Sequence, residues 1–156
     1  IEDVGVDAVR YFFVERSASS HLDFNYNLAM EQSSSNPVFY CQYAHARCAS
    51  LLKLGEEFPI DQEGKCLKEP EEFAILKHLA DFSGMIESAA KEREPAKMTA
   101  YVHKLAGLVH EFYASCRIID RENRDLTSSR LGLIKACEIV LENGLGILGV
   151  SAPEKM

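Results

Sequence analysis

The sequence predicts an all-α fold, a helical bundle of five or six helices that forms a single domain over residues 1–156. Apolar residues recur at steps of three and four along most of the chain, which is the spacing of one helix face. Of the 156 residues, 47% are hydrophobic and 26% are charged, and only 9 are Gly and 5 are Pro. This composition is typical of a globular domain. Strand signals are few, because the alternation of apolar and polar residues at 22–26 is brief.

The first two helices are predicted from local signals. One covers Asp7–Arg16, and an irregular stretch follows at about 17–25. The next begins after the Asn-Pro pair at 36–37, an N-cap residue followed by a proline in the first turn. It runs from about 37 to 54 and ends at Gly55.

Three apolar stripes predict the rest of the bundle. The first runs from Ile75 to Ala90. The second, from Met98 to Ile119, predicts one helix of about six turns. The third runs from Leu131 to Leu148, with Thr127 or Ser128 as the N-cap.

Charge is unevenly distributed along the chain. There are 17 basic and 24 acidic residues, which gives a formal net charge of −7. Residues 56–72 are rich in acids, prolines and glycine, and we interpret them as a solvated acidic variable loop. Residues 117–135 are locally basic. The net acidity argues against unselective polyanion binding, and we expect no DNA partner, but a local patch for RNA stays open.

Catalytic and metal-binding motifs are absent from the sequence. There is no phosphate-binding glycine loop and no nucleophile elbow, so we assign no catalytic residue. The five histidines have no spacing that completes a zinc motif, so we expect no metal site. The five cysteines lack paired spacing, and we expect reduced, mostly buried thiols in a cytosolic protein, with Cys41 and Cys48 in the core. No apolar run reaches the roughly 20 residues of a membrane span, and no leader opens the chain. A first residue Ile1 suggests a piece of a longer protein.

Several strings, in order along the whole chain, carry a resemblance to a known family. They are Gly5–Phe13, Ser20–Phe24, Asn36–Arg47, Asn143–Val150 and Pro153–Met156. They resemble the helical domain that follows the KMSKS loop of bacterial arginyl-tRNA synthetases. Asp7-Ala8-Val9-Arg10 is similar to the Asp-Ala-Leu-Arg tetrapeptide that names this anticodon-binding domain, with Val in place of Leu.

The resemblance implies a class I synthetase in which a separate catalytic domain binds ATP (with Mg) and arginine and joins arginine to tRNA. The present chain, which lacks the HIGH and KMSKS signatures, would hold the anticodon arm, carry no cofactor and be non-catalytic by itself. We expect a cytoplasmic protein that meets no membrane. Cysteinyl and glycyl synthetases carry related domains and stay as alternatives. A helical protein-interaction module, docking a basic partner on residues 56–72, is the alternative of a different class.

Unpaired RNA bases stack on aromatic and guanidinium planes, and the resemblance places such residues at the anticodon. The predicted tRNA-binding residues are Tyr40, Tyr43, Arg47, Tyr113, Arg117, Arg121, Arg124 and Met156. By their spacing of four, Tyr43 and Arg47 share a helix face, and so would Tyr113 and Arg117. For the tyrosines the alternative is internal packing between helices. For Met156 the resemblance implies a chain end that turns back toward the anticodon loop.

Residues 1–25 are predicted to form the junction with the missing catalytic domain. The predicted junction residues are Asp7, Arg10, His21 and Asp23. Asp7 and Arg10 are expected to form an internal salt bridge on one helix face. The aromatic residues at 11–13 are expected in the core.

Overall fold

The computed structural model describes residues 4–17 and 20–156, and within these ranges every regular element is a helix. The elements are α1 (Val6–Val14), α2 (Tyr26–Met30), α3 (Pro37–Leu54), α4 (Pro70–Ala80), α5 (Phe82–Glu92), α6 (Ala96–Ser115) and α7 (Arg124–Leu148). The predicted all-α bundle is therefore confirmed, although the described residues form seven helices rather than five or six.

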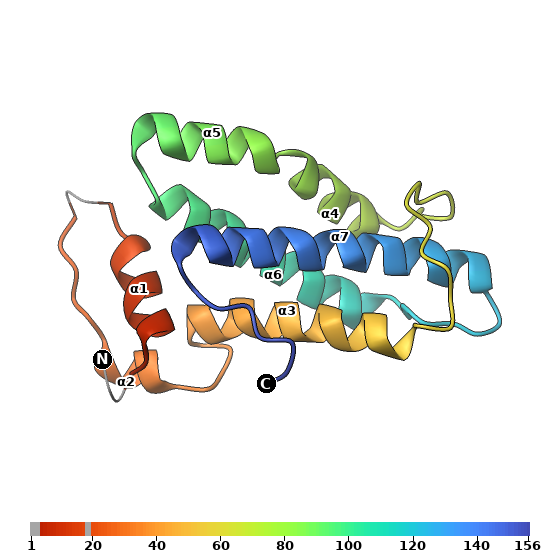
Figure 1. Cartoon of the computed structure of the whole chain (residues 1–156), viewed down its shortest axis with the longest axis horizontal. Coiled ribbons are helices and arrows are strands. Elements are labelled where there is room, and N and C mark those ends of the chain that lie inside the picture. Colours follow the sequence, from red (N-terminus) through yellow and green to blue (C-terminus); the bar gives the residue numbers. More distant parts are fainter. Residues whose placement is uncertain (1–3, 18–19) are drawn as a thin grey trace.

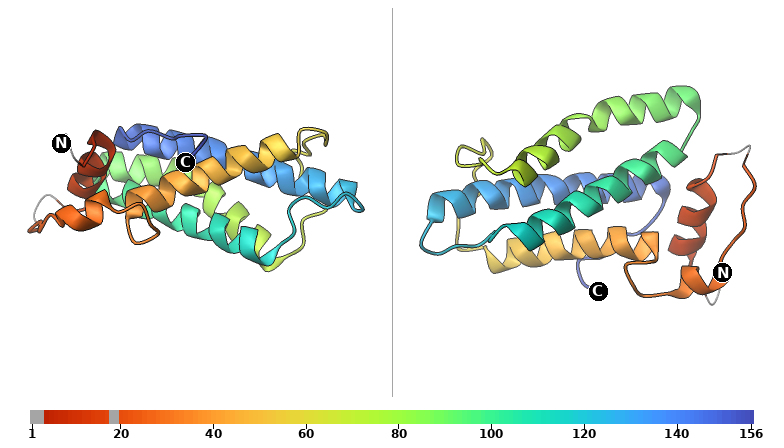
Figure 2. Two further views of the ribbon diagram at one scale, coloured as in Figure 1. Left: turned by 90° about the horizontal axis from the view of Figure 1, so that it is seen from below. Right: turned by 180° about the vertical axis from the view of Figure 1, so that it is seen from behind.

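Three long helices, α3, α6 and α7, pack against one another and enclose the core (Figure 1). Helices α4 and α5 pack on α6, and α1 and α2 lie at one end of the bundle (Figure 2). The core contains Cys41 and Cys48 of α3, Phe112 of α6 and Leu141 of α7, all with no exposed surface. The prediction that Cys41 and Cys48 are core thiols is confirmed.

Helix α3 begins and ends where the sequence predicts. The Asn36 side chain accepts a hydrogen bond from the Val38 amide at 3.1 Å, and Pro37 occupies the first turn. Gly55 follows as the C-cap residue. Local capping chemistry marks the start of this helix, whereas at its end a Cβ at residue 55 would lie 2.6 Å from the Leu131 side chain, so glycine there fits the packing on α7.

Helix α1 stops at Val14, two residues earlier than predicted. Tyr11 and Phe12 are buried as expected, but Phe13 is 60% exposed, so its assignment to the core is wrong. Successive helical residues point about 100° apart, so three aromatic residues in a row cannot all face one side. Residues 18 and 19 of the predicted irregular stretch lie outside the described residues.

The stripe from Ile75 to Ala90 belongs to two helices, not one. The chain breaks at Asp81, whose amide bonds back to the carbonyls of His78 and Leu79. Leu79 before the break and Phe82 after it both pack on the core. The apolar spacing therefore continues across the break and conceals it.

The stripe that begins at Met98 also overruns its helix. Helix α6 ends at Ser115, and Cys116 is extended, with φ −122° and ψ 134°. Cys116 and Ile119 still contact the core from the following segment. Apolar residues therefore continue past the helix end at helix-like spacing, and the predicted end at 119 is wrong.

The N-cap of helix α7 lies four residues before Thr127, the first of the two predicted N-caps. Asn123 is the N-cap, and its side chain accepts from the Leu126 amide at 3.3 Å. Thr127 lies buried inside the helix, where its hydroxyl donates to the Asp120 carbonyl at 2.8 Å and accepts from the Asp120 amide at 2.9 Å. Thr127 thus fixes the preceding loop instead of capping the helix, and Ser128 is helical too.

The acidic loop is shorter and less solvated than predicted. Helix α4 starts at Pro70, so the loop ends at residue 69. Asp61 accepts the Ser129 hydroxyl of α7 at 2.6 Å. A Cβ at Gly132 would lie 2.0 Å from the Asp61 carbonyl oxygen, so the loop packs tightly on α7 at that point.

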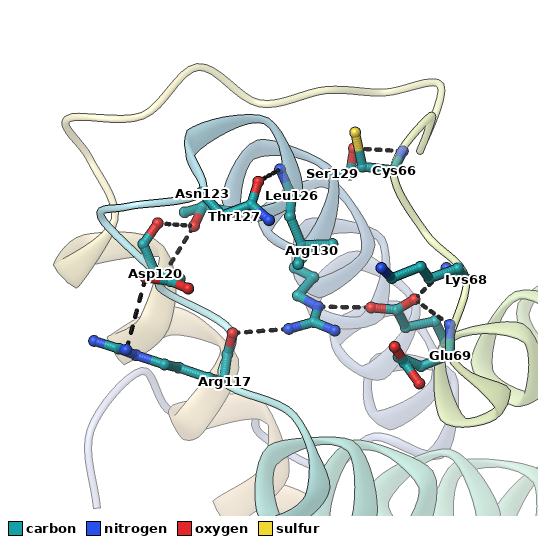
Figure 3. A network of polar contacts seen from close by, with 11 residues as sticks. Cys66, Lys68, Glu69, Arg117, Asp120, Asn123, Leu126, Thr127, Ser129 and Arg130 are labelled. Carbon is teal, nitrogen blue, oxygen red and sulfur yellow. Dashed lines mark hydrogen bonds and ion pairs between the residues drawn. The ribbon is translucent and has the colours of Figure 1, made fainter.

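Glu72 is the sharpest departure from the solvated interpretation, because its side chain is fully buried. It accepts Nε of Arg130 at 2.6 Å and the amides of Lys68 and Glu69 at 2.7 and 2.8 Å. Burial raises the pKa of Glu72, but the amide hydrogen bonds and Arg130 outweigh burial and hold the pKa below its usual value. Arg130 also donates to the Arg117 carbonyl at 2.9 Å (Figure 3). One buried ion pair therefore ties α4, α7 and the segment after α6 together.

No helix in the part of the chain that the structure describes combines the length and the apolar character that a membrane crossing requires.

Candidate nucleic-acid interface

Tyr43, Arg47 and Tyr113 form a stacked cluster where α3 meets α6. The Arg47 guanidinium carbon lies 4.7 Å from the Tyr43 ring centroid and 4.1 Å from that of Tyr113. Arg47 also donates to the Tyr43 hydroxyl at 3.0 Å. Tyr43 is 39% and Tyr113 45% exposed. The cluster therefore presents two aromatic rings and one cation at the surface.

The cation beside Tyr113 is Arg47, and the predicted pairing of Tyr113 with Arg117 is wrong. Because α6 ends at Ser115, Arg117 lies outside the helix and does not share its face. The Arg117 side chain extends toward Asp120, at 3.7 Å, and stays 74% exposed (Figure 3). Its backbone carbonyl is held by Arg130.

A surface groove of about 460 Å³ opens beside this cluster. We call residues 149–156 the C-terminal segment; it leaves α7 and runs past α3 (Figure 1). The groove is lined by Tyr43, Arg47, Leu54, Tyr113, Lys155 and Met156, among others. Met156 is 52% exposed, so the structure brings four of the predicted tRNA-binding residues to one groove.

A smaller cavity of about 230 Å³ includes Tyr43 and Arg47 in its wall as well. Its remaining lining includes Phe39, Tyr40 and His110. Phe39 stacks on Tyr43 at 6.1 Å with 9° between the ring planes. Tyr43 and Arg47 thus belong to two neighbouring hollows.

Tyr40 packs internally, as the alternative for it predicts. Its ring lies 5.1 Å from His103 and 4.5 Å from His110, and its carbonyl lies 3.3 Å from Nε2 of His110. Burial raises the pKa of Tyr40. The pKa of His110 is lowered by burial and by the charge of Arg47, and these two effects outweigh the contact with the Tyr40 carbonyl, which raises it. Tyr40 is half-buried and lines the smaller cavity.

Arg121 and Arg124 do not join the groove. The Arg121 guanidinium pairs with Glu57 at 3.2 Å, and that of Arg124 lies 4.7 Å from the Phe58 ring centroid. Both cations hold the loop after α3.

The four predicted junction residues separate into two pairs. Asp7 and Arg10 bond to the C-terminal part of this chain rather than to each other, so their predicted salt bridge is wrong. His21 and Asp23 contact each other at 3.1 Å and are 86% and 95% exposed. Their role at a junction stays a prediction. Residues 1–3 and 18–19 of the junction segment lie outside the described residues.

Sequence reasoning missed Gln42, His45 and Lys155. Gln42 and His45 contact the C-terminal segment, and Lys155 lines the groove. Helical spacing places Gln42 and His45 on one face of α3 but does not say which segment covers that face. Over the described ranges, no three potential ligands among His, Cys, Asp and Glu gather at one point that could hold a metal ion.

The match to a family model places the chain in the class of helical anticodon-binding domains. It belongs to the family described as the DALR anticodon binding domain, whose model matches residues 41–156.

Relatives of known sequence agree over the whole chain. It is 46% identical over 161 residues to the arginine–tRNA ligase of Geobacillus kaustophilus and 45% identical over 160 residues to that of Bacillus subtilis. Each match covers 100% of this chain and 29% of the relative. The chain thus spans less than a third of the length of these relatives.

Solved structures share the fold. The arginyl-tRNA synthetase of Thermus thermophilus matches with a TM-score of 0.84 and 29% identity, over 99% of this chain and 27% of that protein. A putative arginyl-tRNA synthetase from Campylobacter jejuni matches with a TM-score of 0.87, 24% identity and coverage of 99% and 34%. At that identity the second match shows the fold alone.

Proposed function

We propose that the chain is the C-terminal domain of an arginine–tRNA ligase and binds the anticodon arm of arginine-accepting tRNA. The observation that carries the proposal is the Tyr43–Arg47–Tyr113 cluster at the rim of a groove. The similarity to arginine–tRNA ligases over the whole of this chain favours tRNA as the nucleic acid that binds here.

The cluster has the chemistry that unpaired bases require. A base that leaves the anticodon stack exposes an apolar face, and the exposed rings of Tyr43 and Tyr113 offer a stacking surface. Arg47 is already oriented by both rings and by the Tyr43 hydroxyl, so its remaining donors face the groove at little entropic cost. Met156 supplies an apolar wall, Lys155 lines the groove where it can meet a phosphate, and Arg117 is an exposed cation on the segment after α6.

The parent enzyme would carry out the reaction outside these residues. We propose that its catalytic domain binds ATP with Mg and arginine and forms arginyl-tRNA in the cytoplasm. This chain contributes position: it holds the anticodon arm so that the acceptor end reaches that domain. His21 and Asp23, exposed and paired, are proposed to face the catalytic domain.

The proposal is tested by fluorescence anisotropy with a labelled arginine-anticodon stem-loop. A second stem-loop differs only in the central anticodon base. We expect tighter binding of the arginine loop, because the groove accepts a splayed base. Equal affinity for the two would contradict base reading, and binding to neither would overturn the proposal.

Variants locate the binding to the groove. Tyr43→Ala and Tyr113→Ala each remove one ring and should weaken binding by roughly 1–3 kcal/mol, about five- to 150-fold. Tyr26→Ala is the matched control, because Tyr26 is 47% exposed on α2 and lines neither cavity. A loss of affinity in Tyr26→Ala equal to that in the groove variants would show that the cluster is not the site.

A further inference from the structure

The C-terminal segment leaves α7 through a left-handed turn that favours glycine. Gly149 has φ +69°, and the Gly149 and Val150 amides close the helix end on the carbonyls of Gly146 and Leu145, both at 2.9 Å. A Cβ at residue 149 would lie 2.4 Å from Nη2 of Arg10. Helix α1 therefore packs directly on the point where the chain reverses.

Arg10 and Asp7 of α1 both bond to this part of the chain. Nε of Arg10 donates to the Leu148 carbonyl at 3.3 Å, which is one of the unpaired carbonyls at the end of α7. Asp7 accepts the Ser151 amide at 3.2 Å and also the Ser151 hydroxyl.

Helix α3 completes the contacts from the other side. Nε2 of Gln42 donates to Asp7 at 2.8 Å and to the Ser151 carbonyl at 3.0 Å. Nδ1 of His45, a buried residue, lies 2.9 Å from the Pro153 carbonyl. Ser151 is exposed, so hydrogen bonds to a carboxylate, more than burial, hold the segment at this point.

We propose that Asp7 is a positioning residue for RNA binding: together with Gln42 it fixes the C-terminal segment along α3, so that Lys155 and Met156 form one wall of the groove. The inference rests on the proposed function and extends it to α1, which lines no part of the groove. The segment between Ser151 and Met156 spans only five peptide steps, and release at Ser151 leaves the 2.9 Å contact of His45 with the Pro153 carbonyl, so it loosens the groove wall without detaching it. Asp7 thereby couples the position of α1 to the anticodon site.

The test compares Asp7→Ala, a chain cut after residue 150, and both changes together. Backbone amide heteronuclear NOE values report the order of residues 151–156, and anisotropy reports affinity for the arginine-anticodon stem-loop. We expect Asp7→Ala to lower the NOE values of the segment while those of α3 stay unchanged. Its affinity should fall, by less than truncation lowers it because Gln42 and His45 still hold the segment, and adding Asp7→Ala to the cut chain should change nothing further.

Asp23→Ala is the matched control, since Asp23 is a carboxylate whose partner is the neighbouring His21; it should change neither readout. If Asp7→Ala does not fold, Ser151→Ala removes the same side-chain contact from the exposed end. Unchanged NOE values in Asp7→Ala would overturn the inference, and so would a loss of affinity on adding Asp7→Ala to the cut chain that equals the loss it causes in the intact chain. If the intact chain binds neither stem-loop, the proposed function is overturned, and the NOE comparison still decides whether Asp7 positions the segment.

Discussion

Arg47 organises the candidate site at the scale of single residues. Its guanidinium joins a ring of α3 to a ring of α6. Such contacts contribute on the order of 0.5–1 kcal/mol each at exposed sites, which is little for the stability of the domain. These contacts matter because they order the Arg47 side chain before RNA binds. Binding then costs little conformational entropy of this side chain.

His110 makes a measurable contribution to the pH dependence of stability. Burial, assisted by Arg47, lowers its pKa from the usual 6.5 in the folded chain. The unfolded chain therefore takes up a proton first as the pH falls, and the unfolding free energy declines from about pH 6.5 downward. We expect His110→Gln, whose amide nitrogen can still reach the Tyr40 carbonyl, to lose less stability than the wild type over this range.

Urea unfolding at about pH 7.5 and about pH 5.5 checks this prediction, because His110 changes charge between the two in the unfolded chain. For each protein the change in unfolding free energy between the two pH values is measured. The quantity compared is this change in the wild type minus the change in His110→Gln. An identical change in both proteins would show that His110 keeps an ordinary pKa when folded.

At the scale of elements, caps were predictable and helix ends inside apolar stripes were not. Asn36 and Pro37 mark the start of α3 because each acts through its own side chain and backbone, whereas Gly55 at the end also meets the long-range need for space beside Leu131. Asp81 and Cys116 mark ends that leave the apolar spacing intact, since the chain on both sides faces the same core. The spacing of apolar residues indicates which residues face the core, but it does not indicate whether one helix or two helices carry them.

The buried pair of Glu72 and Arg130 shows the same limit for charge. The seven acids among residues 56–72 predict a solvated loop. Nothing in the local sequence separates Glu72 from the other six. Only Arg130, 58 positions away in sequence, makes burial of one carboxylate possible. Long-range partners of this kind are fixed by the packing of α4 on α7, which the local pattern does not contain.

Removing the charge of Glu72 should destabilise the domain strongly. Glu72→Gln keeps the size of the side chain but leaves the buried Arg130 without its counter-charge, and we expect a loss of about 3 kcal/mol in unfolding free energy. Thermal and urea unfolding measure it. Glu71→Gln, one residue earlier on α4, is the control and should stay within about 0.5 kcal/mol of the wild type. If both variants unfold alike, the pair adds no more than a surface charge does.

At the scale of the whole molecule, the groove is made of three segments far apart in the chain. Helix α3 contributes Tyr43 and Arg47, α6 contributes Tyr113, and the C-terminal segment contributes Lys155 and Met156. The resemblance to a known family predicted four of these five residues, and helical spacing paired only the first two. It also assigned Asp7 and Arg10 to a domain junction, which stays a prediction; the sequence does not show that these residues contact Ser151 and Leu148 of the same chain.

The distribution of charge over the molecule sets how binding responds to salt. The net charge of −7 repels RNA as a whole, while the cations Arg47 and Lys155 line the groove. Arg121 and Arg124 contact Glu57 and Phe58. If Arg47, Lys155 and the exposed Arg117 meet phosphates of a single strand, log K against log salt concentration should have a slope of about −2.

Anisotropy titrations from about 50 to 200 mM salt measure that slope. Arg117→Gln should make it shallower by about 0.7, because one phosphate contact is lost, whereas Arg121→Gln should leave it unchanged. A slope near −4 for the wild type would require that Arg121 and Arg124 leave Glu57 and Phe58 and contact phosphates when RNA binds. The loop after α3 would then be part of the RNA-binding surface, and the groove would account for only part of the affinity.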